Sequence, residues 1–207
     1  MGGLGGAGGA AAGAGGANGG RGGSGGSGGG SATGGTGGGG TFVLTSSKIA
    51  TDMEMPAEFT CASTVAPVSP PLAWSGAPPG TMSFAMVFVD TTIINADMTD
   101  ARGYHSAIWD IPASTMALPE NIPTGATITT PVMAKQFSPI GAKYLGPCPN
   151  NGAAPADVYE FRLFALPVAT LTGQLTSVRG ILQAITAAGP LGTAVLRARS
   201  DATGTLR

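Results

Sequence analysis

The chain changes character at residue 41, and this break limits which part of it can fold. The first 40 of its 207 residues hold 24 of the 36 glycines, with alanine, serine and threonine between them, and no aromatic residue. Such a segment cannot bury enough apolar surface to offset the entropy lost when its backbone is ordered. Its glycines follow no Gly-X-Y period, which excludes a collagen helix. We therefore expect residues 1–40 to be a disordered glycine-rich linker.

Residues 41–200 have the composition of one folded domain, followed by a short tail at 201–207. Every aromatic residue lies beyond residue 40, as do nearly all branched aliphatic side chains. About 160 residues suffice for one hydrophobic core. Beyond residue 40, 9 basic residues accompany 11 acidic ones, without a basic run. This balance argues against a nucleic-acid partner. No stretch approaches the roughly 20 apolar residues of a transmembrane segment.

The first residues lack the basic segment and the apolar stretch of a signal peptide. A glycine-rich tether ahead of a compact domain nevertheless suits a secreted protein or a lipoprotein whose signal lies upstream of residue 1. We therefore expect an exported protein (periplasmic, lipid-anchored or secreted) rather than a cytoplasmic one. A hydrophobic, cysteine-ended leader encoded just upstream would support this expectation, and its absence would contradict it.

Hydrophobic periodicity predicts several strands. Residues 41–45 alternate, residues 72–74 form a short apolar run, and residues 83–89 are apolar on both faces, as in a central strand covered on both sides. Two later segments alternate and place a set of side chains on one face. These sets are His105, Ala107, Trp109 and Ile111 in the first segment, and Tyr159, Phe161, Leu163 and Ala165 in the second.

Helix is expected only late in the chain. Thr176 or Ser177 can cap a helix in which apolar residues recur at Val178, Ile181, Leu182 and Ile185. Gly189-Pro190 ends this helix, and a terminal strand follows at 194–199. Many strands with one or two short C-terminal helices predict a mostly-β fold, specifically an antiparallel β-sandwich.

Seven short motifs follow one another along the domain in a recognisable order. They are Phe42-Val43-Leu44-Thr45-Ser46, Met55-Pro56 with Phe59-Thr60-Cys61, Ser69 to Trp74, Gly80 to Met86, His105 to Pro112, Tyr144 to Pro149, and Tyr159 to Leu166. Each is weak alone, but their order argues against a chance match. The domain resembles the phosphatidylethanolamine-binding protein family, specifically its bacterial Raf-kinase-inhibitor-like branch. The resemblance implies a β-sandwich with a C-terminal helix and a surface pocket for a phosphate-type headgroup.

The resemblance also implies which residues bind the ligand: Asp90, His105, Tyr144, Gly146, Pro147 and Asp157. The family's Asp-Pro-Asp-Ala-Pro segment appears as residues 90–94, where only the first aspartate is kept, and its His-Trp pair appears as His105-Ser106. Asp157 stands where the family has a second histidine. Because a carboxylate repels phosphate unless it is protonated or bridged, this change favours weaker anion binding, or an amine-bearing or neutral polar ligand.

Each of these residues also has a purely structural interpretation. His105, the only histidine, can be a half-buried strand residue satisfied by Asp90 or by a backbone carbonyl. Asp90 can be a turn cap. The loop at 146–149 can be a rigid turn, although glycine there would let a ligand approach the backbone. Tyr144 can belong to the core or the rim, and Asp157 can be a solvated loop acid.

An enzymatic site is the less favoured interpretation. A His105-Asp90 pair with Ser106 or Cys148 nearby would be the residues of a nucleophile and its base. Adjacent strand residues should point to opposite faces, which separates Ser106 from His105. Cys148 lies between prolines without an evident activating cation. The chain has no Gly-x-Ser-x-Gly elbow, metal motif or phosphate loop. We expect neither catalysis nor a cofactor.

Cys61 and Cys148 are the only cysteines. The sequence leaves two alternatives for them: two free thiols in a cytosolic protein, or one disulfide. Their spacing matches no zinc motif.

The leading functional hypothesis is a binding module for a small polar, phosphorylated or lipid-headgroup ligand. The alternative is a protein-interaction or inhibitor module, directed at a kinase or protease, with a vestigial pocket. The sequence leaves the ligand, the protein partner and the oligomeric state undetermined.

Overall fold

The structure is a computed structural model that describes residues 40–149 and 155–204. The predicted linker lies outside the described residues except for residue 40, and residues 201–204 of the predicted tail are described. The domain boundaries therefore stay a prediction. No helix within the described residues is long and apolar enough to cross a membrane.

Two antiparallel sheets organise the described residues. The smaller has the strand order β1-β2-β5, and the larger has the order β6-β7-β4-β3-β8-β9. The strands are β1 (Val43–Thr45), β2 (Leu72–Ser75), β3 (Ser83–Asp90), β4 (Tyr104–Pro112), β5 (Ala117–Leu118), β6 (Thr127–Ile128), β7 (Ala134–Phe137), β8 (Asp157–Leu166) and β9 (Gly192–Ser200). The helices are α1 (Thr91–Ala96), α2 (Val178–Ala187) and the 3-10 turns η1 (Ala57–Phe59) and η2 (Ala101–Gly103).

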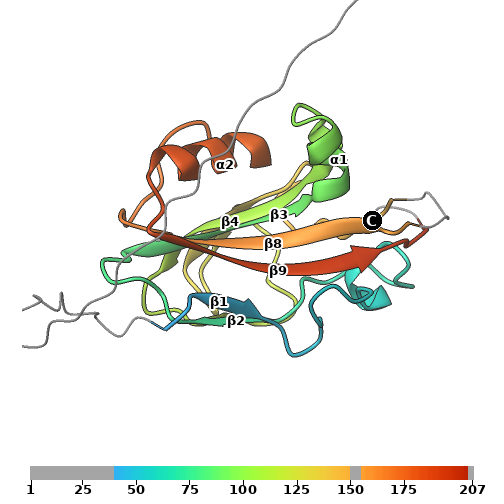
Figure 1. Cartoon of the computed structure of the whole chain (residues 1–207), viewed down its shortest axis with the longest axis horizontal. Coiled ribbons are helices and arrows are strands. Elements are labelled where there is room, and N and C mark those ends of the chain that lie inside the picture. Colours follow the sequence, from blue (N-terminus) through green and yellow to red (C-terminus); the bar gives the residue numbers. More distant parts are fainter. Residues whose placement is uncertain (1–39, 150–154, 205–207) are drawn as a thin grey trace, which may run out of the picture. The chain divides into compact units, whose positions relative to one another are not determined.

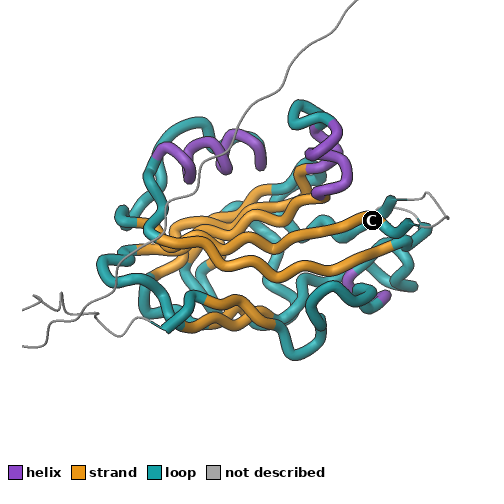
Figure 2. Tube along the Cα trace, in the orientation of Figure 1, coloured by secondary structure: helices purple, strands orange, loops and turns teal. Residues whose placement is uncertain are grey.

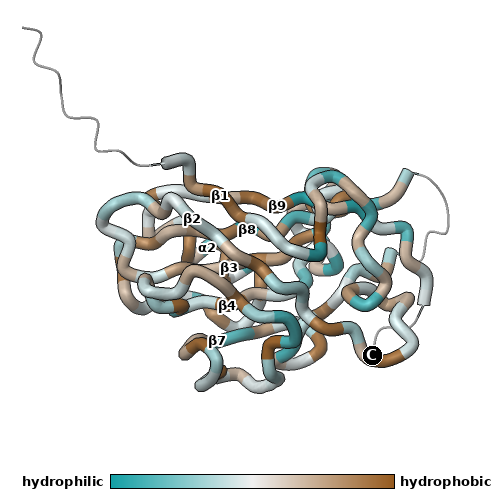
Figure 3. The backbone as a smooth tube through the Cα atoms, turned by 90° about the horizontal axis from the view of Figure 1, so that it is seen from below, coloured by the Kyte–Doolittle hydropathy of each residue, from teal (hydrophilic) through white to brown (hydrophobic). Residues whose placement is uncertain are grey.

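The larger sheet separates two apolar layers. Both α-helices lie on one side of it, and β1 and β2 lie on the other (Figures 1 and 2). The central strand β3 serves both layers, because all eight of its residues are buried. Phe84, Met86 and Phe88 pack between the sheets, whereas alternate residues pack beneath α2. Hydrophobic colours accordingly follow β3, β8 and β9, and several loops at the strand ends are hydrophilic (Figure 3).

The predicted fold class is confirmed: the chain is a mostly-β sandwich of two antiparallel sheets. The expected strands are present, and the four aromatic or aliphatic residues predicted to share one face of β8 all pack between the sheets. Ser177 caps α2 as expected, since its Oγ accepts a hydrogen bond from the Gly180 amide at 3.0 Å. The apolar stripe of α2 lies against the large sheet, with Ile181 and Ile185 fully buried.

The helix α1 was not predicted, because helix was expected only near the C-terminus. Its sequence, Thr-Thr-Ile-Ile-Asn-Ala, is rich in β-branched residues that favour strands. The deciding signal is Asp90, which caps the helix with its side chain. Tertiary packing of Ile94 in the layer beneath α2 supports the helix. Two buried residues, Thr91 and Ile94, and one cap thus outweigh the local preference.

Candidate functional site

A pocket of about 380 Å³, here named the strand-end pocket, opens where three strands of the large sheet meet. The strand β3 runs antiparallel to both β4 and β8, so its last residues lie beside their first ones: Asp90 pairs with Tyr159, and Val89 pairs with Tyr104. The loops at 139–140 and 145–149 complete the wall. Antiparallel pairing therefore brings together residues that are far apart in the sequence.

Asp90 both ends β3 and caps α1. Its Oδ1 accepts a hydrogen bond from the Ile93 amide at 3.1 Å. The residue is 1% exposed, and its Oδ2 is a buried atom without a hydrogen-bond partner among the described residues. Burial raises the pKa of the carboxyl and nearby Asp157 adds to this, while the Ile93 amide and the Tyr159 hydroxyl oppose it. The Tyr159 hydroxyl lies near enough to favour the ionised carboxyl but makes no hydrogen bond to Oδ2. Because buried acceptors are normally paired, Oδ2 is a place for a ligand donor.

His105 is the extra residue of a β-bulge in β4. The pairing with β3 passes from Phe88 and Ser106 directly to Val89 and Tyr104, which leaves His105 unpaired. Its ring lies edge-on to the rings of Phe88 and Tyr159, at 5.3 Å between centroids in each case.

The environment of His105 fixes its protonation. Nδ1 lies 3.2 Å from the carbonyl oxygen of Leu145. Because a carbonyl oxygen can only accept, Nδ1 carries the proton of the neutral ring. Burial lowers the pKa of His105 to about 4, although the carbonyls of Leu145 and Gly146 favour the charged form. At neutral pH the ring is therefore uncharged, and Nε2 is an acceptor.

The predicted common face of residues 105–111 is wrong. Ala107 and Trp109 pack beneath α2, whereas Ile111 packs between the sheets. The bulge at His105 and a second register shift, near Asp110 with its φ of 57°, are responsible. Each extra residue moves the following side chains to the other face, and no periodicity in the sequence reveals where this occurs.

Asp157, Tyr159 and Arg102 supply further polar groups to the strand-end pocket. Asp157 lines it from β8, and burial raises the pKa of this carboxyl as well. Burial and the charge of Asp90 raise the pKa of Tyr159, so its hydroxyl stays protonated. Arg102 is the cation at the rim, but its Nη2 lies 2.6 Å from Oδ2 of Asp100, with 81% of its side chain exposed. The pocket thus favours a ligand that brings hydrogen-bond donors or positive charge.

Cys61 and Cys148 form a disulfide with a Cα–Cα distance of 5.3 Å, which decides between the two alternatives left by the sequence. It ties the loop at 145–149 to the segment after η1. The Cys61 amide also donates to the Pro147 carbonyl oxygen at 2.9 Å. The loop that bears Leu145, the partner of His105, is therefore held by covalent and backbone bonds together.

Gly146 and Pro147 do not line the strand-end pocket, contrary to their predicted role. Leu145, Cys148 and Pro149 of the same loop line it instead. Gly146 is buried against the backbone of Phe59, and a Cβ at this position would lie 2.5 Å from the Phe59 carbonyl oxygen. Glycine is thus required by a close approach of two backbone segments, and not by approach of a ligand.

Gly146→Ala is expected to lower the free energy of unfolding by about 2 kcal/mol, a typical cost of overpacking. The backbone of Phe59 must move to accept the methyl group, because a carbonyl oxygen cannot rotate away as a flexible side chain can. Urea denaturation will measure the loss. Gly40→Ala is the matched control for an added methyl group, since no atom lies within 4 Å of a Cβ there. An unchanged midpoint in Gly146→Ala would contradict the packing argument.

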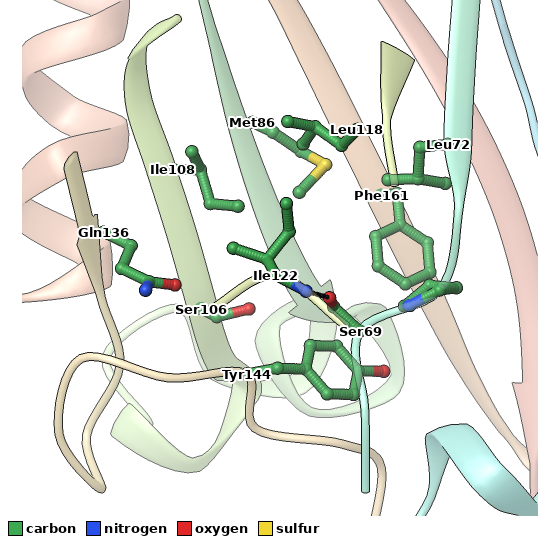
Figure 4. A pocket seen from close by; sticks show the side chains of 11 residues that line it. Ser69, Leu72, Met86, Ser106, Ile108, Leu118, Ile122, Gln136, Tyr144 and Phe161 are labelled. Atoms are coloured by element: carbon green, nitrogen blue, oxygen red, sulfur yellow. Dashed lines mark hydrogen bonds between the residues drawn. The ribbon is translucent and has the colours of Figure 1, made fainter. Parts of the chain in front are cut away.

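Tyr144 is also absent from the strand-end pocket. Its ring stacks on Phe88 at 5.7 Å, and its hydroxyl donates to the Phe59 carbonyl oxygen at 3.0 Å. It lines an inner cavity between the sheets of about 20 Å³, shown in Figure 4 with Ser106, Gln136 and Ile122. Room for about one water molecule does not suit an organic ligand. Tyr144 therefore supports the site from within the core.

The two residues considered for nucleophilic chemistry were Ser106 and Cys148. Ser106 lines the inner cavity and not the strand-end pocket. The thiol of Cys148 is part of the disulfide. No group of three or more His, Cys, Asp or Glu residues that could hold a metal ion occurs in the described part of the chain.

Of the six predicted ligand-binding residues, Asp90, His105 and Asp157 line the strand-end pocket, and Tyr144, Gly146 and Pro147 do not. Tyr159, Tyr104 and Arg102 also line it and were not predicted as site residues. Tyr159 was correctly expected to share a face with Phe161, Leu163 and Ala165. Its position near the start of the strand could have indicated that it lines the pocket. Arg102 lies in η2, where no pattern in the sequence marks it.

Comparisons with known sequences identify relatives along most of the domain. A family model described as "Phosphatidylethanolamine-binding protein" matches residues 45–199. A UPF0098 protein of Methanothermobacter thermautotrophicus is 30% identical over 112 residues, which are 54% of this chain and 68% of the relative. A UPF0098 protein of Aquifex aeolicus is 29% identical over 134 residues, which are 64% of this chain and 72% of the relative.

Solved structures show the same fold. Escherichia coli YbcL, described as a new member of the mammalian PEBP family, matches with a TM-score of 0.62 and 23% identity, over 78% of this chain and 99% of YbcL. CT736 of Chlamydia trachomatis, described as a putative PEBP homolog, matches with a TM-score of 0.58 and 24% identity, over 78% of this chain and 97% of CT736. At these identities the likeness concerns the fold alone.

Proposed function

Because the chain belongs to the phosphatidylethanolamine-binding protein family, we propose that it is a non-enzymatic binding module whose strand-end pocket holds a small polar ligand bearing an amine. The observation that carries this proposal is the buried Oδ2 of Asp90, which lacks a hydrogen-bond partner among the described residues. An ammonium group supplies both the missing donor and a compensating charge. Family membership supports a binding role in general, and the choice of ligand rests on the pocket.

The charges of the pocket favour an amine over a bare phosphate. Asp90 and Asp157 contribute two carboxyl groups, and neutral His105 adds an acceptor. A phosphate alone would meet repulsion from these groups. A headgroup that carries both charges, such as phosphoethanolamine, can direct its ammonium group to Asp90 and leave its phosphate at the rim near Arg102.

Asp90→Asn is expected to weaken binding of phosphoethanolamine about tenfold, as for loss of one charge-assisted hydrogen bond. Asparagine still caps a helix well, so α1 is retained. Calorimetric titration with ethanolamine, phosphoethanolamine, phosphocholine and inorganic phosphate will measure the affinities. Ethanolamine compounds should bind more tightly than phosphocholine, which has no N–H donor. His105→Ala should also abolish or strongly reduce binding.

Asp97→Asn is the matched control, since it removes the same charge beside the same helix without lining the strand-end pocket. Inorganic phosphate that binds as tightly as phosphoethanolamine, together with an unaffected Asp90→Asn variant, would contradict the amine proposal. No binding across the panel would favour the alternative function, a protein-interaction or inhibitor module. The partner would then be sought by affinity pull-down with the intact domain.

We further propose that the protein works in an oxidising compartment outside the cytoplasm. The disulfide between Cys61 and Cys148 is compatible with export, because cytosolic thiols are generally kept reduced. Thiol alkylation of the protein taken from fractionated native cells, followed by mass spectrometry, will report the redox state. Free thiols in a cytoplasmic fraction would contradict the proposal.

A further inference from the structure

A second hollow, distinct from the strand-end pocket, lies beside α1. This cleft has a volume of about 460 Å³ and is formed by α1 together with the helix-bearing face of β8 and β9. In Figure 1, α1 lies over one end of these strands and α2 over the other. The cleft shares no lining residue with the strand-end pocket, because successive residues of β8 face opposite sides. We name it the arginine cleft, after Arg162, Arg197 and Arg199.

The strand register gathers the three arginines. Arg197 pairs with Glu160 across β8 and β9, and Arg199 pairs with Val158 one step along the same face. Arg162 follows Glu160 by two residues on β8. Side chains two residues apart on a strand lie on one face, about 7 Å apart. The result is three guanidinium groups around the Glu160 carboxylate, in a chain whose formal net charge is only −1. A second carboxylate, Asp52, lies 3.7 Å from Nη1 of Arg197.

Glu160 orients two of these guanidinium groups without using all their donors. The residue is 8% exposed, and its Oε2 accepts from Arg162 Nε at 2.7 Å. Its Oε1 accepts from Arg197 Nε at 3.2 Å and from Arg197 Nη2 at 3.1 Å. Each carboxylate oxygen therefore serves one arginine. The two terminal nitrogens of Arg162 make no hydrogen bond among the described residues.

Arg199 adds an uncommitted cation at the edge of the cleft. Its side chain is exposed and makes no hydrogen bond or ion pair with the described residues. Thr92 and Asn95 supply polar groups from α1. Among the described residues that line the cleft, Val158 is the only apolar one. This lining suits a compact, strongly polar anion and offers nothing to an acyl chain or an apolar side chain.

From this arrangement we propose that the arginine cleft binds a compact polyanion, a small molecule with at least two phosphate or carboxylate groups. Guanidinium groups bind such groups through paired N–H donors. Arg162 and Arg199 lie on either side of the Glu160–Arg197 pair, so one anionic group cannot engage both fully. Two linked groups can, which favours pyrophosphate or citrate over inorganic phosphate.

Pyrophosphate, citrate and inorganic phosphate will be titrated into the isotope-labelled full chain, with binding followed by NMR. Pyrophosphate or citrate should shift the amides of β8, β9 and α1 with submillimolar affinity at low salt, and inorganic phosphate should bind at least fivefold more weakly. Which of the two polyanions binds better distinguishes a phosphate from a carboxylate ligand. Arg162→Gln combined with Arg199→Gln should weaken binding at least tenfold.

Arg179→Gln combined with Lys143→Gln is the matched control, because it removes the same charge without touching either site. This variant should bind within twofold of the wild type, as should His105→Ala. Arg199→Gln alone, which leaves the Glu160 bonds intact, should weaken binding about threefold even if the double variant unfolds. Absence of binding at 5–10 mM pyrophosphate and citrate (roughly the weakest affinity of interest) would overturn the proposal, as would equal weakening in the control.

Discussion

Replacing Cys61 and Cys148 together by serine is expected to lower the free energy of unfolding by about 4 kcal/mol. The disulfide joins residues 87 apart in the sequence, and closing a loop of this length restricts the unfolded chain strongly in the loop-entropy model. Because a domain of this size is typically stable by only 5–15 kcal/mol, the loss would be a large share of the total. Urea denaturation of the oxidised wild type and the double variant will measure it.

Reduction of the wild-type protein tests the same prediction without any substitution. The reduced protein should unfold at the same urea concentration as the double variant, because both lack the cross-link and keep the remaining side chains. The disulfide also holds the loop whose Leu145 carbonyl oxygen accepts a hydrogen bond from His105. A difference below 1 kcal/mol between oxidised and reduced protein would contradict the stabilising role.

The second large effect is a loss of stability on acidification that depends on His105. Burial lowers the pKa of this residue to about 4 in the folded protein, whereas an unfolded histidine titrates near 6.5. Between these values the unfolded chain binds a proton that the folded chain does not. The free energy of unfolding should therefore fall as the pH drops from about 6.5 to about 4, by about 3 kcal/mol in total.

Asp90 and Asp157 act in the opposite direction, because burial raises the pKa of both carboxyl groups. Their contribution becomes more favourable as the pH falls and partly offsets that of His105. The comparison that isolates the histidine is wild type against His105→Gln, since both proteins keep the two aspartates. Urea denaturation at pH 4 to 7 should give a smaller loss in the variant. Parallel curves for the two proteins would contradict a buried neutral imidazole.

The fold could be predicted largely from local patterns. The apolar run at 83–89 identified a strand covered on both faces, and β3 is buried along its whole length. Ser177 and the apolar period behind it identified α2. These predictions succeeded because burial on one or both faces of an element leaves a direct trace in the spacing of apolar residues.

The site could be predicted only in part. Asp90, His105 and Asp157 were identified, and they meet because β3 is antiparallel to both its neighbours. Gly146 was identified for the wrong reason, since its role is set by the Phe59 backbone, nearly 90 positions earlier in the chain. The bulge that leaves His105 unpaired cannot be seen in the alternation of residues 105–111. Contacts between distant segments have no local signature.

The sequence by itself determined the change of composition at residue 41, the β-sandwich, the C-terminal helix and His105 as the one imidazole of the candidate site. Each follows from composition or from periodicity within one segment. Only the tertiary structure decided that the two cysteines are bonded, that α1 interrupts the strands, and that a carboxylate-bearing pocket and an arginine cleft use opposite faces of β8. The physical reason is that charge, burial and register at these sites arise between strands, where pairing brings together residues that the chain keeps apart.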